Sequence, residues 1–199
     1  MPKGRWVIRV AGKLRIHYKD FIRVFYSPKS LYREISKGRK CSSWLCVLVY
    51  CLIYVMGSLW LYFRGFTPFV KPWIKLPEDV YYLVQAFYLL PLVFLMWILG
   101  TGVLHILCKQ FGGKGRFEVL LLMTGYSLWA PWYPLIIVDC IHSTPEWLYH
   151  TILVLCIVFI LIGTTVAAMV EEKINLIIGF ISSIISLSSI GLILFTYIR

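Results

Sequence analysis

Residues 147–170 read WLYHTILVLCIVFILIGTTVAAMV, a run without a single Asp, Glu, Lys or Arg. A helix that crosses the hydrocarbon core of a bilayer needs about 20 consecutive, mostly apolar residues. This stretch meets that need, and similar stretches lie at 44–63, 80–108, 117–139 and 174–198. The pattern predicts an all-α, polytopic integral membrane protein whose core is a bundle of five transmembrane helices.

The overall composition excludes a water-soluble domain. Of the 199 residues, 60% are hydrophobic, whereas a soluble domain has roughly 45–50%. Five spans this apolar cannot all be hidden inside a domain of this length. We therefore expect two parts: a basic, amphipathic cytoplasmic segment at residues 1–43, and a five-helix membrane domain at residues 44–199.

The positive charge is unevenly distributed along the chain, whose net charge is +11. Residues 1–43 contain twelve Lys and Arg but only two acidic residues, Asp20 and Glu34. With the N-terminus inside, the inner segments hold sixteen basic residues and the outer ones four. The positive-inside rule then predicts a cytoplasmic N-terminus and, after five spans, an external C-terminus. Nucleic acid is not an expected partner, because no recognition motif accompanies these charges.

The segment 14–37 has the pattern of two short amphipathic helices. Ser27 suits an N-cap, Pro28 suits a first helical position, and Gly38 suits a helix end. The apolar residues of this segment follow the i, i+3, i+4 spacing that places them on one helix face: Phe21, Val24, Phe25, Leu31, Tyr32 and Ile35. Such a helix can lie on a membrane surface or pack on its own membrane domain, and both alternatives stay open. Contact with anionic lipid headgroups is expected for Lys29, Arg33, Lys37, Lys114 and Arg116.

Histidines and acidic residues supply no convincing metal or haem site. His105 and His150 lie near opposite membrane faces, roughly 25–30 Å apart, too far to share one iron. A cluster at the outer side, which could bind a divalent metal, comprises Asp139, Cys140, His142, Glu146 and His150. Its spacing matches no diagnostic ligand pattern, so we interpret it as a polar turn at the interface. We expect no cofactor and no metal.

Two further patterns were tested for catalysis. Glu171-Glu172 resembles the start of the EExxxR motif of proteases that cleave prenylated proteins, but residues 171–176 read EEKINL and lack the arginine. We interpret the pair as a charged turn between spans. The stretch 111–118, FGGKGRFE, lacks phosphate-loop spacing, although free N–H groups at a helix start there can attract an anion weakly. No G-x-S-x-G is present, and we predict that the protein is not an enzyme.

Polar residues are sparse inside the spans. Their central portions hold no charged residue, whereas coupled transporters usually need one at mid-membrane. We expect interhelical hydrogen bonds from Gln85, His105, Thr124, Tyr126, Thr164 and Thr165. Close packing of the last span is expected along the row Gly179, Ser182, Ser186 and Ser189. Pro91 should kink the second span, and Pro131 and Pro134 lie near the outer end of the third. Kinked spans keep a permease open as an alternative.

Two stretches resemble a known family. Residues 21–40, FIRVFYSPKSLYREISKGRK, resemble an N-terminal signature of the Yip (Ypt/Rab-interacting protein) domain family, and residues 111–134, FGGKGRFEVLLLMTGYSLWAPWYP, resemble its glycine-rich element and following span. The positions that carry the resemblance are Ser27, Pro28, Gly112, Gly113, Lys114, Gly115, Phe117, Tyr126 and Pro131. It covers roughly residues 20–199. The short, basic N-terminal segment is similar to prokaryotic members and departs from the longer, acidic segments of eukaryotic members, which contact Rab GTPases.

The resemblance implies a non-catalytic scaffold or accessory subunit in membrane organisation, trafficking or a transport complex. We expect the plasma membrane of a prokaryote as its location, and the bilayer, anionic headgroups and another membrane protein or complex as partners. The alternatives are a permease or channel for a small solute and, more weakly, an intramembrane metalloenzyme that uses the outer cluster. A continuous polar path would favour the permease, and closely packed spans without a cavity would favour the scaffold.

Overall fold

The computed structural model describes residues 18–39, 43–66, 77, 79–140 and 145–198, and every regular element in these ranges is helical. Residues 18–26 form a first short helix. The elements that follow are α2 (Pro28–Ser36), α3 (Ser43–Phe63), α4 (Tyr81–Gln110), α5 (Phe117–Trp129), the 3-10 turn η1 (Ala130–Trp132), α6 (Tyr133–Cys140), α7 (Glu146–Glu172) and α8 (Leu176–Ile198). Each predicted span therefore coincides with helix, to within about two residues at either end.

The third predicted span is interrupted where the sequence places Pro131. Helix α5 stops at Trp129, a single 3-10 turn follows, and α6 continues from Tyr133. Proline removes a backbone N–H and crowds the preceding turn, which explains the change of helix type. The carbonyl oxygen of Pro131 accepts a bond from the Cys156 thiol at 2.8 Å. Pro91, in contrast, lies inside α4, which continues through it as one helix.

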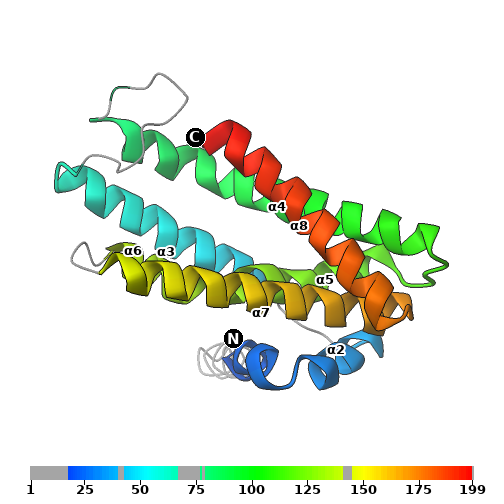
Figure 1. Cartoon of the computed structure of the whole chain (residues 1–199). Coiled ribbons are helices and arrows are strands. Elements are labelled where there is room, and N and C mark those ends of the chain that lie inside the picture. The colour runs from blue at the N-terminus through cyan, green and yellow to red at the C-terminus, as the bar shows by residue number, and fades with distance from the viewer. Residues whose placement is uncertain (1–17, 40–42, 67–76, 78, 141–144, 199) are drawn as a thin grey trace, which may run out of the picture.

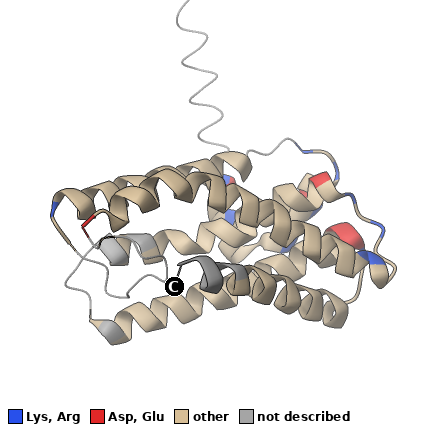
Figure 2. Ribbon diagram, turned by 90° about the horizontal axis from the view of Figure 1, so that it is seen from above, with Lys and Arg blue, Asp and Glu red and all other residues tan. Residues whose placement is uncertain are grey.

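Three of the described helices, α3, α4 and α7, are long and apolar enough to cross a membrane, and α8 adds a shorter described apolar stretch, Leu176–Leu192. Their outward faces carry large apolar side chains, for example Met56, Leu155 and Ile177, that are at least half exposed. Charged residues lie at the ends of these helices and leave their middles bare (Figure 2). Helices that are apolar both inside and outside are typical of a lipid environment.

The helices pack through two buried clusters. One joins α2 to α4, α5 and α7 through residues such as Leu31, Leu120 and Ala167, and the other joins α3 to α4, α5 and α7. Helix α8 crosses α4 and α7 (Figure 1), and the Ser186 hydroxyl donates to the carbonyl oxygen of Gly100 at 2.7 Å. That bond confirms the close approach predicted from the small residues of the last span.

The polar residues of the spans behave mostly as expected. Gln85 donates to the Tyr54 hydroxyl at 3.1 Å, and the hydroxyls of Thr101 and Thr124 lie 2.6 Å apart. These are interhelical bonds, and they confirm the prediction for Gln85 and Thr124. The prediction was wrong for Thr165, whose buried hydroxyl has no hydrogen-bond partner among the described residues. It was also wrong for Thr164, whose hydroxyl donates at 2.8 Å to the Ile160 carbonyl of its own helix. A threonine can satisfy itself this way because the carbonyl four residues back lies within reach.

Candidate functional site at the glycine loop

A loop of residues 111–116, here called the glycine loop, joins α4 to α5. Gly112 has φ of +82°, a left-handed conformation that costs glycine little and other residues more. The N–H of Gly113 donates to the Cys108 carbonyl at 2.9 Å and ends α4. The Lys109 ammonium donates to the Gly115 carbonyl at 2.9 Å. These bonds hold the loop tightly against the end of α4.

Both residues of the glutamate pair, Glu171 and Glu172, are buried against this loop. They end α7, and their exposed fractions are 5% and 0%. The N–H of Gly115 donates to Glu172 Oε2 at 2.8 Å, and the N–H of Arg116 donates to Glu171 Oε1 at 2.9 Å. The free N–H groups at the start of α5 therefore bind carboxylates, which the positive end of a helix dipole also favours.

The other carboxylate oxygens have partners too. Glu172 Oε1 pairs with Nδ1 of His105 on α4. Glu171 Oε2 accepts a bond from the Ser36 hydroxyl at 2.7 Å, which ties the pair to α2. The Arg116 guanidinium lies 4.0 Å from Glu171 and is largely exposed. A buried carboxylate is tolerated only when hydrogen bonds replace its water, and each of these four oxygens has such a bond.

The glycines are required by the closeness of this contact. A Cβ at Gly115 would lie 2.8 Å from the backbone oxygen of Glu171 and 2.8 Å from Cδ of Glu172. A Cβ at Gly113 would lie 2.7 Å from the Cys108 carbonyl oxygen and 2.7 Å from Glu172 Oε2. A side chain at Gly115 would push the end of α7 away from the loop, and one at Gly113 would displace the end of α4 and the Glu172 carboxylate. The close packing of the glutamate pair against the loop therefore explains why Gly113 and Gly115 are glycines.

The interpretation of Glu171-Glu172 as a charged turn was therefore wrong. Two acidic residues directly at the end of an apolar helix, on the side of the chain that is otherwise basic, were the available signal. The expected anion attraction at the start of α5 is present, but the bound anion is the chain's own. The side chains of Lys114 and Arg116 remain exposed beside this contact.

The residues 18–39, here called the N-terminal arm, pack on the membrane domain. Leu31, Tyr32 and Ile35 are at most 2% exposed and join the cluster formed with α5 and α7. The Tyr32 and Ser127 hydroxyl oxygens lie 2.5 Å apart in this interface. Of the two alternatives that the sequence left open, the structure has the arm packed on its own bundle (Figure 1). Its apolar face is therefore not available to enter a bilayer.

Ion pairs connect the two helices of the arm. Arg23 donates to both carboxylate oxygens of Glu34 at 2.6 and 3.0 Å, and Arg39 pairs with Glu34 and, at 2.8 Å, with Asp20. The hydrogen bonds from Arg23 hold the pKa of Glu34 at about 2. Burial raises the pKa of Asp20 despite the neighbouring Arg39. These ion pairs hold the helix of residues 18–26 against α2.

The predicted caps of α2 are partly confirmed. Ser27 occupies the N-cap position and Pro28 the first turn, but the Ser27 side chain makes no capping bond. Gly38 ends the helix with φ of +92°. The face opposite the buried one carries Lys29, Arg33 and Lys37, all exposed. The arm thus presents a basic surface outward while its apolar side is covered.

The sequence model of the Yip1 domain matches residues 22–197, which includes the arm, the glycine loop and the helices of the bundle. The chain belongs to the Yip1 domain family. Searches of the curated proteins and of the solved structures give no match. Membership agrees with the resemblance seen in the sequence.

Of the remaining motif positions of this Yip1 domain, Phe117 lies beside the glutamate contact. Its ring meets the His105 ring edge-on, with centroids 5.8 Å apart. Tyr126 and Pro131 lie farther along the third span: Tyr126 is fully buried beside the arm in the first cluster, and Pro131 marks the break between α5 and α6. The motif positions of the glycine loop and Phe117 therefore serve the glutamate contact, while Tyr126 serves the packing of the arm.

The outer cluster of the Yip1 domain is only partly visible. His142 and the side chains of Asp139, Cys140 and Glu146 lie outside the described residues, while His150 is exposed on α7. Within the described ranges, no three His, Cys, Asp or Glu side chains gather as metal ligands. Metal binding at the outer cluster stays an untested alternative.

Proposed function

We propose that this Yip1 domain protein is a non-catalytic scaffold or accessory subunit in membrane organisation, trafficking or a transport complex. The observation that carries the proposal is the fixed N-terminal arm. Buried contacts at Tyr32 and Ser36 hold it on the bundle, so the exposed basic face of Lys29, Arg33 and Lys37 has a defined position. A surface held rigidly on the bundle suits recognition of a partner better than chemistry.

The proposal includes a topology and a location. We infer five spans, a cytoplasmic N-terminus and an external C-terminus in the plasma membrane of a prokaryote, as the distribution of basic residues favours. The arm and the exposed side chains of Lys114 and Arg116 then lie on the cytoplasmic side. There each basic residue close to an anionic leaflet gains about 1 kcal/mol. Anionic headgroups and another membrane protein or complex are accordingly the proposed partners.

The absence of catalysis is part of the same proposal. The buried glutamates and His105 are engaged with each other and with the glycine loop. The glutamate pair and His105 are therefore explained by their role in packing α4, α7 and the glycine loop together. A permease is supported less well, because the described lining of the cavity between the helices is mainly aliphatic and aromatic and includes no charged side chain. A charged solute would find no group of opposite charge there.

A site-specific photocrosslinker tests the proposal in native membranes. Benzoyl-phenylalanine placed singly at Lys29, Arg33 and Lys37 should give protein adducts, because these side chains face outward from the arm. The same group at Leu155, which is half exposed on the apolar face of α7, should give lipid adducts only. Charge reversal at the two other basic positions should reduce the protein adducts, whereas Lys19→Glu on the first helix serves as a matched control.

Absence of any protein adduct from the three arm positions would contradict the scaffold proposal. A second measurement addresses the alternative: the purified protein in vesicles should show no more leakage of small solutes than protein-free vesicles. Solute uptake that depends on the protein would favour the permease instead.

A further inference from the structure

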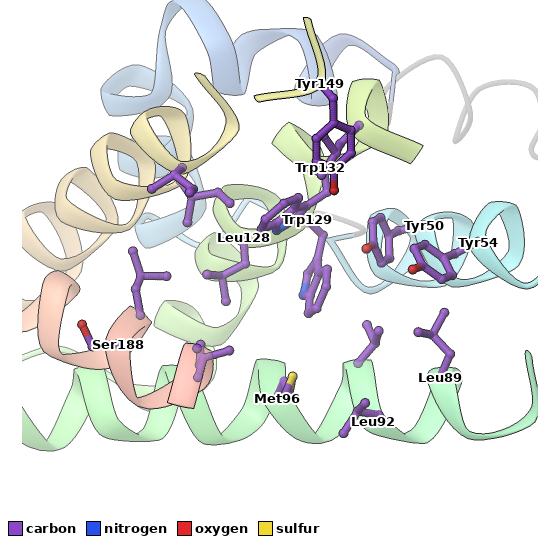
Figure 3. Close-up of a pocket in the computed structure, with 17 residues that line it drawn as sticks. Tyr50, Tyr54, Leu89, Leu92, Met96, Leu128, Trp129, Trp132, Tyr149 and Ser188 are labelled. Carbon is purple, nitrogen blue, oxygen red and sulfur yellow. The ribbon is translucent and has the colours of Figure 1, made fainter. Parts of the chain in front are cut away.

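A cavity of about 550 Å³ lies between α3, α4, α7, α8 and the interrupted third span (Figure 3). Its walls differ in chemistry. Tyr50, Trp132 and Tyr149 contribute aromatic rings from α3, η1 and α7, while α4 contributes aliphatic side chains such as Leu92 and Met96. No charged residue lines it within the described part of the chain, and Ser188 supplies its one serine hydroxyl.

This lining decides what can fill the cavity. The polar side chains in the lining are Ser188, Tyr50, Tyr54, Tyr149, Trp129 and Trp132, whereas the wall that α4 contributes is aliphatic. That wall does not hold water well, because a buried water needs two to four polar partners. Leaving it empty forfeits the dispersion contacts of every residue in its walls. Its volume falls in the range of pockets that bind small organic molecules. An apolar occupant is therefore favoured over both water and vacuum.

The surface next to the cavity indicates which apolar molecule can reach it. Ile157, Ser188 and Gly191 line the cavity and are also exposed, so it communicates with the outer surface of α7 and α8. That surface is apolar and carries exposed side chains such as Val158 and Ile184, as expected for helices in contact with lipid. Hydrocarbon chains are the most abundant apolar groups next to such a surface.

We propose that the cavity is a binding site for one acyl chain of a membrane phospholipid. The chain enters between α7 and α8 and packs against the aliphatic residues of α4. Tyr149 lies in the first turn of α7, where an amphipathic ring favours headgroup level, and Trp132 lies beside it in the break of the third span (Figure 3). The ester end of the lipid lies near these rings. The site is independent of the proposed partner surface on the N-terminal arm.

Gly191 offers a way to fill the cavity without distorting the helices. It lines the cavity, and a Cβ added there would meet no atom within 4 Å. Gly191→Phe therefore places a ring in open space. Gly102 on α4 is a matched control, because a Cβ there also meets nothing within 4 Å and the residue does not line the cavity.

The test uses the full chain in vesicles that contain phosphatidylcholine with a photoactivatable diazirine on one acyl chain. After illumination, peptide mass spectrometry locates the adducts. We expect adducts on Leu92, Met96 and neighbouring cavity residues, and a roughly tenfold loss of these adducts in Gly191→Phe, because the ring occupies the volume of the chain. Gly102→Phe should label like the wild type, and adducts on the lipid-facing Leu155 should be unchanged in all three proteins.

Several outcomes would overturn the assignment. Equal cavity labelling in Gly191→Phe and in the wild type would show that the adducts do not come from the cavity. Adducts restricted to outward residues such as Leu155 would show that the cavity excludes the lipid. Labelling by diazirine palmitate but not by the phospholipid would assign the site to free fatty acid instead. Leu92→Trp provides a second filling variant if Gly191→Phe does not retain the helical content of the wild type.

Discussion

The contact between the glycine loop and the glutamate pair predicts that Gly115→Ala destabilises the fold. The added Cβ would lie 2.8 Å from the carbonyl oxygen of Glu171 and 2.9 Å from its carbonyl carbon. These are backbone atoms at the end of α7, so no side-chain rotation can remove the overlap. The loop or the helix end must shift.

The cost follows from what that shift breaks. Overpacking of this kind costs about 1–3 kcal/mol when the surroundings must move. A shift that lengthens the bond from the Gly115 N–H to Glu172 Oε2 also weakens a hydrogen bond to a charged group, which contributes about 1.5–3 kcal/mol. A shift of the loop relieves the overlap but weakens the hydrogen bond, so the two costs are not fully additive. We expect a total of about 2–4 kcal/mol, a large fraction of a typical stability of about 5–15 kcal/mol.

Unfolding by sodium dodecyl sulfate in mixed bicelles, followed by circular dichroism, measures this change. Gly102→Ala is the matched control: it adds a methyl group where nothing lies within 4 Å, and alanine gains up to about 1 kcal/mol over glycine in a helix. The control should therefore be neutral or more stable than the wild type.

A double-variant cycle sharpens the test. Glu172→Ala removes the Cδ atom that the new methyl group would meet, so Gly115→Ala should cost less in that background than in the wild type. Strict additivity, or a cost below about 0.5 kcal/mol for Gly115→Ala alone, which is the usual range for surface changes, would refute the reasoning.

Three further predictions concern the arm and the topology. Tyr32→Phe should cost about 1 kcal/mol in the same unfolding assay, since Ser127 keeps its bond to the Met123 carbonyl; a neutral result would show that the Tyr32 hydroxyl does not hold the arm. The ion pairs lower the pKa of Glu34 from 4.5 to about 2, so their contribution is complete above pH 4.5 and is lost as pH falls towards 2. A spin label on the arm should gain mobility over that window in the wild type, and the gain should be smaller in Glu34→Gln, where only the pair between Arg39 and Asp20 remains to be lost on protonation. On a cysteine-free background, an external thiol reagent should reach a cysteine near Pro72 and miss one at the exposed Lys114 position of the glycine loop; the reverse pattern would overturn the proposed topology.

The positions of the helices could be predicted from the sequence because the underlying signals are local. An apolar run must be long enough to cross a bilayer. Pro131 coincides with the break in the third span, whereas α4 continues through Pro91, so a proline marks a possible break but does not decide it. The beginning and end of α2 also follow from Pro28 and Gly38, because each residue's effect depends on its own backbone conformation and not on distant contacts. Family membership was visible for a related reason, since its motif residues lie in two short stretches.

The role of the motif was not visible in the same way. Glu171 and Glu172 bind N–H groups of residues that precede them by more than fifty positions. The one local signal, an acidic pair at the end of an apolar helix, does not say which segment of the chain binds the pair. The glycines were recognised as a family element, but their reason lies in the space that α7 occupies.

The sequence by itself thus determined that the chain forms apolar helices, where each begins and ends, and which face of the N-terminal arm is apolar. It could not determine what covers that face, because a bilayer and a neighbouring helix both remove the same side chains from water. Only the tertiary structure decided that α5 and α7 cover it. The structure likewise decided that the glutamate pair is buried in the glycine loop, and that the packing of α8 on α4 and α7 leaves a cavity. Each of these depends on contacts between segments far apart in the chain, and a hydrophobic pattern records how much surface is buried but not against which partner.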